Sequence, residues 1–169
     1  MNYKYILALD PSGNYDEGKG TTGCCIIEAK TNTIIETKSI YANAYNCQFE
    51  YWQAVLLYVT KAFVKYKSMI VVIEDFMLYK SKAQAQVNSK METPKLIGVL
   101  EFFCTEREIP TVLQAAHEVK NRWNDEVLLY KGYIVRRGRQ FRTCNDKSID
   151  RHALDAIRHA VHYLTFKNK

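Results

Sequence analysis

The sequence predicts an α/β protein with a single domain, residues 1–169, in which helices flank a mixed five-stranded sheet. Two observations support this fold class. Three strand-like runs open the chain and are joined by short connections, which is typical of an antiparallel meander. Helical patterns and short apolar runs then alternate to the end of the chain, the order expected of parallel strands joined by crossover helices.

The first half of the chain supplies the antiparallel strands and one helix. We expect strands at Tyr3–Leu9, Thr22–Glu28 and Thr33–Ile40, where apolar and β-branched residues concentrate. The polar residues of Ala29–Asn32 indicate a tight turn between the second and third strands. Along Gln48–Lys67 apolar residues recur every three or four positions, which predicts a helix with one buried face.

The second half supplies the parallel strands and two more helices. Met69–Ile73 is a continuous apolar run, typical of a strand buried on both faces. We expect Thr93 to cap a helix over Pro94–Arg107, since proline is well tolerated at the first helical position. A fifth strand follows at Ile109–Leu113, and a last helix spans Ile149–Phe166. The order βββαβαβα is that of the ribonuclease H-like architecture.

Composition and charge narrow the class of protein. Hydrophobic residues make up 47% of the chain and aromatic residues 12%, as in a folded globular protein. The net charge of +6 favours a polyanionic partner such as nucleic acid. No secretion signal, membrane-spanning run or organic-cofactor motif is recognised, so we expect a cytoplasmic protein. The odd number of cysteines without a CxxC pair indicates reduced core residues. They are Cys24, Cys25, Cys47, Cys104 and Cys144.

Acidic side chains stand where two predicted strands end. Asp10 follows the first strand and Glu74 the fourth, so both would face one crevice if these strands are neighbours. The last helix adds His152 and Asp155, which lie about 60° apart on one helical face. Mg²⁺ or Mn²⁺ suits such oxygen ligands, and the chain lacks the spacing of a zinc site. The alternative, that each acid only marks the exposed end of a strand, stays open.

Three other polar residues of the last helix are left out of this site. Asp150 suits the first helical turn, where an anion meets the positive end of the helix dipole. His159 and His162 continue the stripe of His152, but the helical rise places them roughly 10 to 15 Å from it. We therefore expect these two histidines to form part of a solvated polar face.

Four segments, in this order, resemble the RuvC family of Holliday-junction resolvases, especially its short phage-encoded branch. They are "ILALDPSG" with "TTG", "VVIEDF", "IPTVLQAAHEVK" and "HALDAIRHA", and together they span nearly the whole chain. The metal ligands that the resemblance implies are Asp10, Glu74, His152 and Asp155. It also implies a catalytic role for Lys120, for which a plain surface lysine is the alternative. The insertion "NYDEGKG" lengthens the first turn of the family pattern.

The resemblance also implies an activity. Members resolve four-way DNA junctions by paired symmetric nicks, in recombination and repair, as homodimers. The implied chemistry is phosphodiester hydrolysis with two Mg²⁺ ions per site, which leaves 5′-phosphate and 3′-hydroxyl ends. Mn²⁺ is expected to substitute for Mg²⁺, whereas Ca²⁺ is not. The apolar helix Pro94–Arg107 offers a subunit contact, and a phage-encoded member would act in the cytoplasm of a bacterial host.

Cationic side chains cluster in two stretches that flank the predicted site in sequence. The residues that we expect to contact DNA are Phe76, Lys80, Lys82, Lys90, Arg136, Arg137, Arg139 and Arg142. The cations would neutralise phosphates and make binding strongly salt-dependent. Phe76 would stack on bases or wedge between them. Solvated surface charges, and a core position for Phe76, are the alternatives.

Other functions remain open on the same residues. A related nuclease would use the same chemistry on other branched DNA or on RNA. The segment "LDPSG" with "GTTG" is also similar to the phosphate loop of actin-like and sugar-kinase ATPases. Those enzymes close two such domains over a nucleotide, whereas this chain has the length of one. An inactive nucleic-acid-binding module is a further alternative, although every expected ligand type is present.

Overall fold

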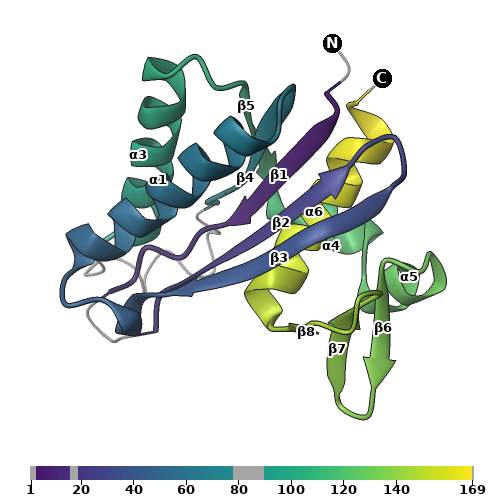
Figure 1. The fold of residues 1–169 in the computed structure, drawn as a ribbon. Coiled ribbons are helices and arrows are strands. Elements are labelled where there is room, and N and C mark those ends of the chain that lie inside the picture. Colours follow the sequence, from purple (N-terminus) through teal and green to yellow (C-terminus); the bar gives the residue numbers. More distant parts are fainter. Residues whose placement is uncertain (1–2, 16–18, 78–89, 169) are drawn as a thin grey trace.

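The computed structural model describes residues 3–15, 19–77 and 90–168. Its main sheet has five strands in the order β3-β2-β1-β4-β5 (Figure 1). They are β1 (Tyr5–Asp10), β2 (Thr21–Glu28), β3 (Thr33–Tyr41), β4 (Met69–Asp75) and β5 (Thr111–Ala115). Strands β1, β2 and β3 pair antiparallel, whereas β4 runs parallel to both β1 and β5. The predicted mixed sheet is therefore confirmed.

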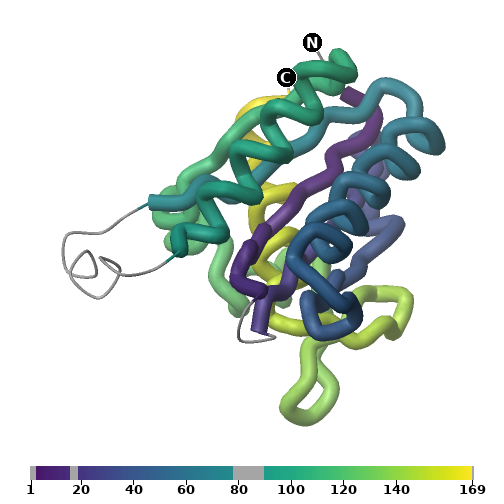
Figure 2. Tube along the Cα trace, turned by 90° about the vertical axis from the view of Figure 1, so that its left-hand side faces the viewer, coloured from purple at the N-terminus to yellow at the C-terminus, as the bar shows by residue number. Residues whose placement is uncertain are grey.

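Helices cover both faces of this sheet. They are η1 (Ala42–Ala44), α1 (Gln48–Lys65), α3 (Glu92–Glu106), α4 (Ala116–Arg122), α5 (Asp125–Tyr130) and α6 (Arg151–Phe166). Figure 2 shows α1 and α3 side by side on one face, with α6 behind the sheet. Successive strand side chains point to opposite faces, so Leu7 and Leu9 pack toward α1 and α3, whereas Ile6 and Ala8 pack toward α6. Two apolar cores result, one on each side of β1.

The chain between β5 and α6 contains structure that sequence analysis did not predict. Helices α4 and α5 are followed by a second, three-stranded sheet of β6 (Ile134–Arg137), β7 (Gln140–Thr143) and β8 (Ser148–Ile149). The β6–β7 hairpin extends away from the main sheet (Figure 1). Its two-residue loop contains Gly138 with φ 61°, the positive φ that such loops need. Sequence analysis did not predict these elements because they are short and because frequent arginines interrupt the alternation of apolar and polar residues that marks a strand.

Two predicted helix starts are wrong. Helix α3 begins at Glu92, and the hydroxyl of Thr93 accepts a hydrogen bond from the Gly13 N–H (3.1 Å) instead of capping the helix. Pro94 still lies in the first turn of α3, where backbone N–H groups have no partner within the helix. The N–H that proline lacks therefore costs the helix no hydrogen bond. Helix α6 begins two residues later than predicted because Ile149 belongs to β8.

The expectation for the cysteines holds in part. Cys24, Cys25 and Cys104 are buried, but Cys47 and Cys144 are exposed. These two residues lie outside the apolar runs, at the start of α1 and in the loop after β7. Within the three described ranges, no helix combines the length and the apolar character needed to cross a membrane.

Candidate metal centre

The sheet brings Asp10 and Glu74 to one place. Strands β1 and β4 are parallel neighbours, and Leu9 pairs with Ile73 in their register. The next residue of each strand is therefore Asp10 or Glu74, at the carboxyl edge of the sheet. The two-residue period places both side chains on the face toward α6, as it does Ala8. The sheet therefore fixes both carboxylates beside the first turns of α6.

Helix α6 adds a third carboxylate to this pair. Carboxylate oxygens of Asp10, Glu74 and Asp155 all lie within 4.8 Å of one another. His152 joins the group through Asp10, since its Nδ1 lies 2.7 Å from Asp10 Oδ2. The structure thus brings the three predicted carboxylate ligands together from β1, β4 and α6 and places His152, the fourth predicted ligand, beside Asp10. Three converging carboxylates suit a hard divalent cation, which takes oxygen ligands, so the donor set fits Mg²⁺ or Mn²⁺.

Gly23 allows α6 to approach the sheet this closely. It lies opposite Asp10 in the β1–β2 register. A Cβ atom at Gly23 would lie 2.1 Å from the carbonyl carbon and oxygen of His152. Any larger residue would therefore push the first turn of α6 away from the sheet. The glycine of the "TTG" segment is thus a close-approach position that helps to bring His152 to Asp10.

The chain after Asp10 is held by buried polar contacts. Tyr51 of α1 is fully buried, and its hydroxyl donates a hydrogen bond to the Ser12 carbonyl (2.7 Å). The same hydroxyl lies 2.8 Å from Thr22 Oγ1 of β2. Further along, the Tyr15 N–H donates to the Glu92 carboxylate (2.8 Å). These contacts tie the first turn to α1, β2 and α3, and they fix the direction in which β1 ends.

Basic side chains surround the three carboxylates. The Nζ of Lys120 lies 3.0 Å from Glu74 Oε1 and 3.0 Å from Asp155 Oδ2. Arg158, one turn beyond Asp155 on α6, contacts both Asp155 and Asp125 and donates from Nε to the Trp123 carbonyl (2.9 Å). The structure thus places Lys120, a predicted site residue, between two of the predicted ligands. Sequence analysis missed Arg158, although its spacing of three from Asp155 is that of neighbours on a helix.

Burial and charge shift the pKa values of this cluster. Burial raises the pKa of Asp10, and the nearby Glu74 carboxylate adds to this effect against the hydrogen bond from His152. Burial also opposes the charge of Glu74, but His159 and Lys120 outweigh it and lower the pKa of Glu74 to about 2. The pKa of His152 is raised by its hydrogen bond to Asp10. Crowded carboxylates of this kind are what a bound divalent cation would stabilise in the ionised form.

The expectation of a solvated face for His159 and His162 is wrong. Both side chains are buried, and His159 has no exposed surface. Its Nε2 lies 2.9 Å from Glu74 Oε2, and its Nδ1 lies 3.0 Å from Gln114 Oε1. His162 lies against Phe166, with 5.1 Å between the ring centroids. His159 is therefore covered by side chains of β4 and β5, and His162 packs near the end of the same helix. The sequence does contain a signal for the burial of His159, because this residue lies between the apolar positions 157 and 160.

The predicted DNA contacts fall in different surroundings. Phe76 is half-buried and packs against the core beneath α3, beside a cavity of about 140 Å³ that Glu74 also lines. This position agrees with the alternative that Phe76 is a core residue. Lys90 is exposed just before α3, whereas Lys80 and Lys82 lie outside the described residues.

The predicted arginines lie on the β6–β7 hairpin. Arg136, Arg137 and Arg139 are exposed, and Arg142 is partly buried. Arg137 and Arg142 both pair with the Asp146 carboxylate, at 3.2 and 3.5 Å. Because exposed ion pairs of this kind are weak, the hairpin keeps a strongly positive surface.

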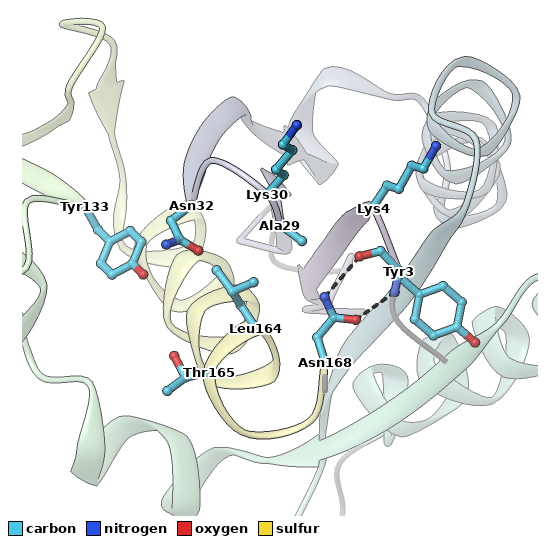
Figure 3. Close-up of a pocket in the computed structure, with 9 residues that line it drawn as sticks. All are labelled: Tyr3, Lys4, Ala29, Lys30, Asn32, Tyr133, Leu164, Thr165 and Asn168. Atoms are coloured by element: carbon cyan, nitrogen blue, oxygen red, sulfur yellow. Dashed lines mark hydrogen bonds between the residues drawn. The ribbon is translucent and has the colours of Figure 1, made fainter.

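A larger cavity, of about 580 Å³, lies at the opposite end of β1, where the two ends of the described chain meet. Figure 3 shows its lining, in which the Tyr3 N–H donates to Asn168 Oδ1 (2.7 Å) beside Leu164 and Thr165 of α6. Its lining contains no carboxylate, histidine or cysteine, so it offers no metal ligands among the described side chains.

Comparisons with known proteins agree with this architecture. Neither a protein-family model nor a curated protein sequence matches the chain. Among solved structures, Thermus thermophilus RuvC in complex with a Holliday junction substrate is similar, with a TM-score of 0.66, 12% identity and 98% of each chain covered. A second structure of Thermus thermophilus RuvC gives a TM-score of 0.62 at 12% identity, covering 97% of each chain.

The large terminase nuclease of the thermophilic phage G20c is also similar, with a TM-score of 0.52 and 10% identity over 95% of this chain and 82% of that one. At identities this low, the similarity concerns the fold alone. It covers the five-stranded sheet and the helices that position the carboxylates. The chain therefore has the ribonuclease H-like fold, in an arrangement similar to that of RuvC.

Proposed function

We propose that this protein is a metal-dependent endonuclease that resolves four-way DNA junctions. The observation that supports it most is the convergence of Asp10, Glu74 and Asp155 within 4.8 Å at the carboxyl edge of a ribonuclease H-like sheet. A similar structure, RuvC, is described in complex with a Holliday junction substrate. Basic side chains close to the carboxylates and on the hairpin suit a polyanionic substrate.

In this proposal, Asp10, Glu74 and Asp155 hold two Mg²⁺ ions, with His152 as a further ligand. Mn²⁺ would substitute. Bound divalent ions would supply an activated water and offset the charge that develops on the leaving 3′ oxygen. Asp10 would be the ligand shared by the two ions, because its carboxylate is close to Glu74 on the sheet and to His152 on α6. The products would be 5′-phosphate and 3′-hydroxyl ends.

Lys120 would act on the substrate and not on the ions. Its ammonium group lies 3.0 Å from both Glu74 and Asp155, at the edge of the carboxylate cluster. The carboxylates raise the pKa of Lys120 against the opposing effect of burial, so the group stays cationic at neutral pH. A cation in this place can donate a hydrogen bond to the scissile phosphate and stabilise its charge. We therefore assign Lys120 as the catalytic lysine.

The β6–β7 hairpin and its flanks would hold the DNA backbone. Residues 131–147 contain six basic side chains and one acidic side chain, and so a net charge of +5. The whole chain has a net charge of +6, so nearly all of its excess positive charge lies in this segment. Exposed arginines on a projecting hairpin can follow phosphates without reading bases. The hairpin joins α6 through β8, directly before the helix that holds His152 and Asp155.

A homodimer would match the approximate two-fold symmetry of a four-way junction and would allow paired symmetric nicks. Helix α3 offers one contact surface, because its Phe102 side chain is 68% exposed. Resolution of junctions would place the protein in DNA recombination or repair, and a phage-encoded protein would act in the cytoplasm of a bacterial host.

The decisive experiment compares cleavage of three labelled substrates in Mg²⁺: a four-way junction, a linear duplex and an RNA–DNA hybrid. The wild-type protein should nick the junction symmetrically and leave the other two intact. Asp10→Asn should bind the junction as tightly as the wild type but should not cut it. Cleavage of the linear duplex or the hybrid at a similar rate would instead favour a related nuclease, and the absence of any metal-dependent cleavage would refute the proposal.

A further inference from the structure

His159 bridges two side chains on neighbouring strands. Glu74 and Gln114 are direct partners in the parallel β4–β5 register, and both face α6. The His159 ring lies across them, with Nε2 at 2.9 Å from Glu74 Oε2 and Nδ1 at 3.0 Å from Gln114 Oε1. Both ring nitrogens are therefore used, one on each strand.

The contact with Glu74 leaves the other oxygen of that carboxylate directed at the site. Glu74 Oε1 faces Lys120, at 3.0 Å, while Oε2 is held by His159. A carboxylate with one oxygen bound to a rigid donor has lost the freedom to turn about its terminal torsion. Its second oxygen is then held toward Lys120, whose ammonium group also contacts Asp155.

We propose that His159, supported by Gln114, is a positioning residue that orients the Glu74 carboxylate for metal binding. This inference rests on the proposed function, in which Glu74 is a metal ligand. Outer partners of this kind fix the direction of the ligand, and their loss costs metal affinity. In the described chain no other side chain is hydrogen-bonded to Glu74 Oε2, so His159 is the group on which this orientation depends.

Packing alone does not explain this arrangement. A buried imidazole needs hydrogen-bond partners, and an apolar residue would fill the same space without that requirement. Gln114 can serve the ring in either protonation state, because its amide oxygen accepts from an Nδ1–H and its NH₂ donates to a bare Nδ1. The Gln114–His159–Glu74 chain therefore holds the carboxylate in place whether or not the ring is charged.

The test measures Mn²⁺ binding without DNA, by the electron paramagnetic resonance signal of free Mn²⁺. His159→Leu keeps the volume and removes the hydrogen bond, and we expect its Mn²⁺ dissociation constant to rise about 10- to 100-fold. His159→Gln restores a donor to Glu74 and should recover most of the affinity. His162→Leu is the matched control: it alters another buried histidine of α6 that has no contact with a carboxylate among the described residues. Its affinity should stay within about twofold of the wild type, a change below 1 kcal/mol.

Thermal unfolding of each variant separates folding from metal binding. If His159→Leu does not fold, Gln114→Leu replaces it, because it removes only the support at Nδ1. Wild-type affinity in a folded His159→Leu variant, or an equal loss in His162→Leu, overturns the positioning role while leaving the nuclease proposal intact. A wild-type protein that binds no Mn²⁺ would instead remove the basis of both proposals.

Discussion

The ammonium nitrogen of Lys120 lies 3.0 Å from the Glu74 carboxylate, and the same nitrogen lies 3.0 Å from Asp155. The chain thus places its own cation between two of the proposed metal ligands. Without such a charge, three carboxylates this close would repel one another. Lys120 therefore stabilises the folded protein in the absence of a metal, and a bound divalent ion would take over part of that role.

Lys120→Met should make the stability of the protein depend more strongly on metal. In the presence of a chelator, we expect the free energy of unfolding to fall by about 1 kcal/mol, a modest cost because the lysine side chain is 37% exposed. Addition of Mg²⁺ should then raise the melting temperature more in the variant than in the wild type. Differential scanning calorimetry with chelator and with Mg²⁺ measures both effects. Lys61→Met, an exposed position on α1, is the control, and equal Mg²⁺ responses in all three proteins would contradict the prediction.

Gly23→Ala should disturb the proposed metal centre through the backbone. The new methyl group would collide with the His152 carbonyl, so the first turn of α6 must move away from Asp10. We expect a loss of roughly 1 to 3 kcal/mol in the free energy of unfolding, as for other overpacked sites, and weaker Mn²⁺ binding. Gly98→Ala on α3 meets nothing within 4 Å and should stabilise the protein by about 0.5 to 1 kcal/mol. Urea denaturation of both variants tests the contrast, which fails if the two changes have the same sign.

The main sheet and its covering helices could be predicted because their periodic apolar residues pack against a large core. The segment between β5 and α6 could not. Its helices have seven and six residues, too short to show a clear helical period, and its β6 and β7 strands contain as many arginines as apolar side chains. Their order comes from tertiary contacts, such as the burial of Leu128 and Ile134, which are not visible in local sequence.

The carboxylates could be predicted for a different reason. Asp10 and Glu74 follow buried runs, and the three-residue spacing of His152 and Asp155 fixes their common helical face. The supporting contacts of His159 depend instead on which strands neighbour β1 and on the direction in which α6 crosses them. The helical rise predicts roughly 10 Å between His152 and His159, but it could not show that Glu74 lies beside His159.

Asp150→Ala should weaken the start of α6. The Asp150 carboxylate accepts a hydrogen bond from the Ala153 N–H (2.8 Å) and another from the Tyr41 hydroxyl (2.7 Å). Loss of such a cap costs about 1 kcal/mol, whereas Asp150→Asn keeps a capping oxygen and should cost less.

The contribution of this cap should depend on pH. Burial opposes the charge of Asp150, but these hydrogen bonds lower the pKa of Asp150. A lowered pKa means that the stabilisation is present at neutral pH and is lost as the pH falls through the folded-state pKa, below about 4. Urea denaturation should show the gap between wild type and Asp150→Ala shrinking over that acidic range, and a gap that is constant with pH would contradict the charged cap.

Removal of hairpin arginines should weaken DNA binding without altering the chemistry. In an Asp10→Asn background, which prevents cutting, Arg137→Gln/Arg139→Gln should lower the affinity for a labelled four-way junction. Each lost phosphate contact should reduce the slope of log K against log[salt] by about 0.9, so the double variant should lose nearly two units. Lys4→Gln/Lys30→Gln removes the same charge at the far end of the sheet and should leave the slope unchanged. Fluorescence anisotropy across a salt series measures both slopes.

If the salt slope falls by the same amount in the two double variants, the hairpin has no special role, and only net charge governs binding. If only the hairpin variant changes, its cleavage rate at saturating enzyme, measured with Asp10 restored, should remain that of the wild type, because neither arginine contacts the carboxylate cluster.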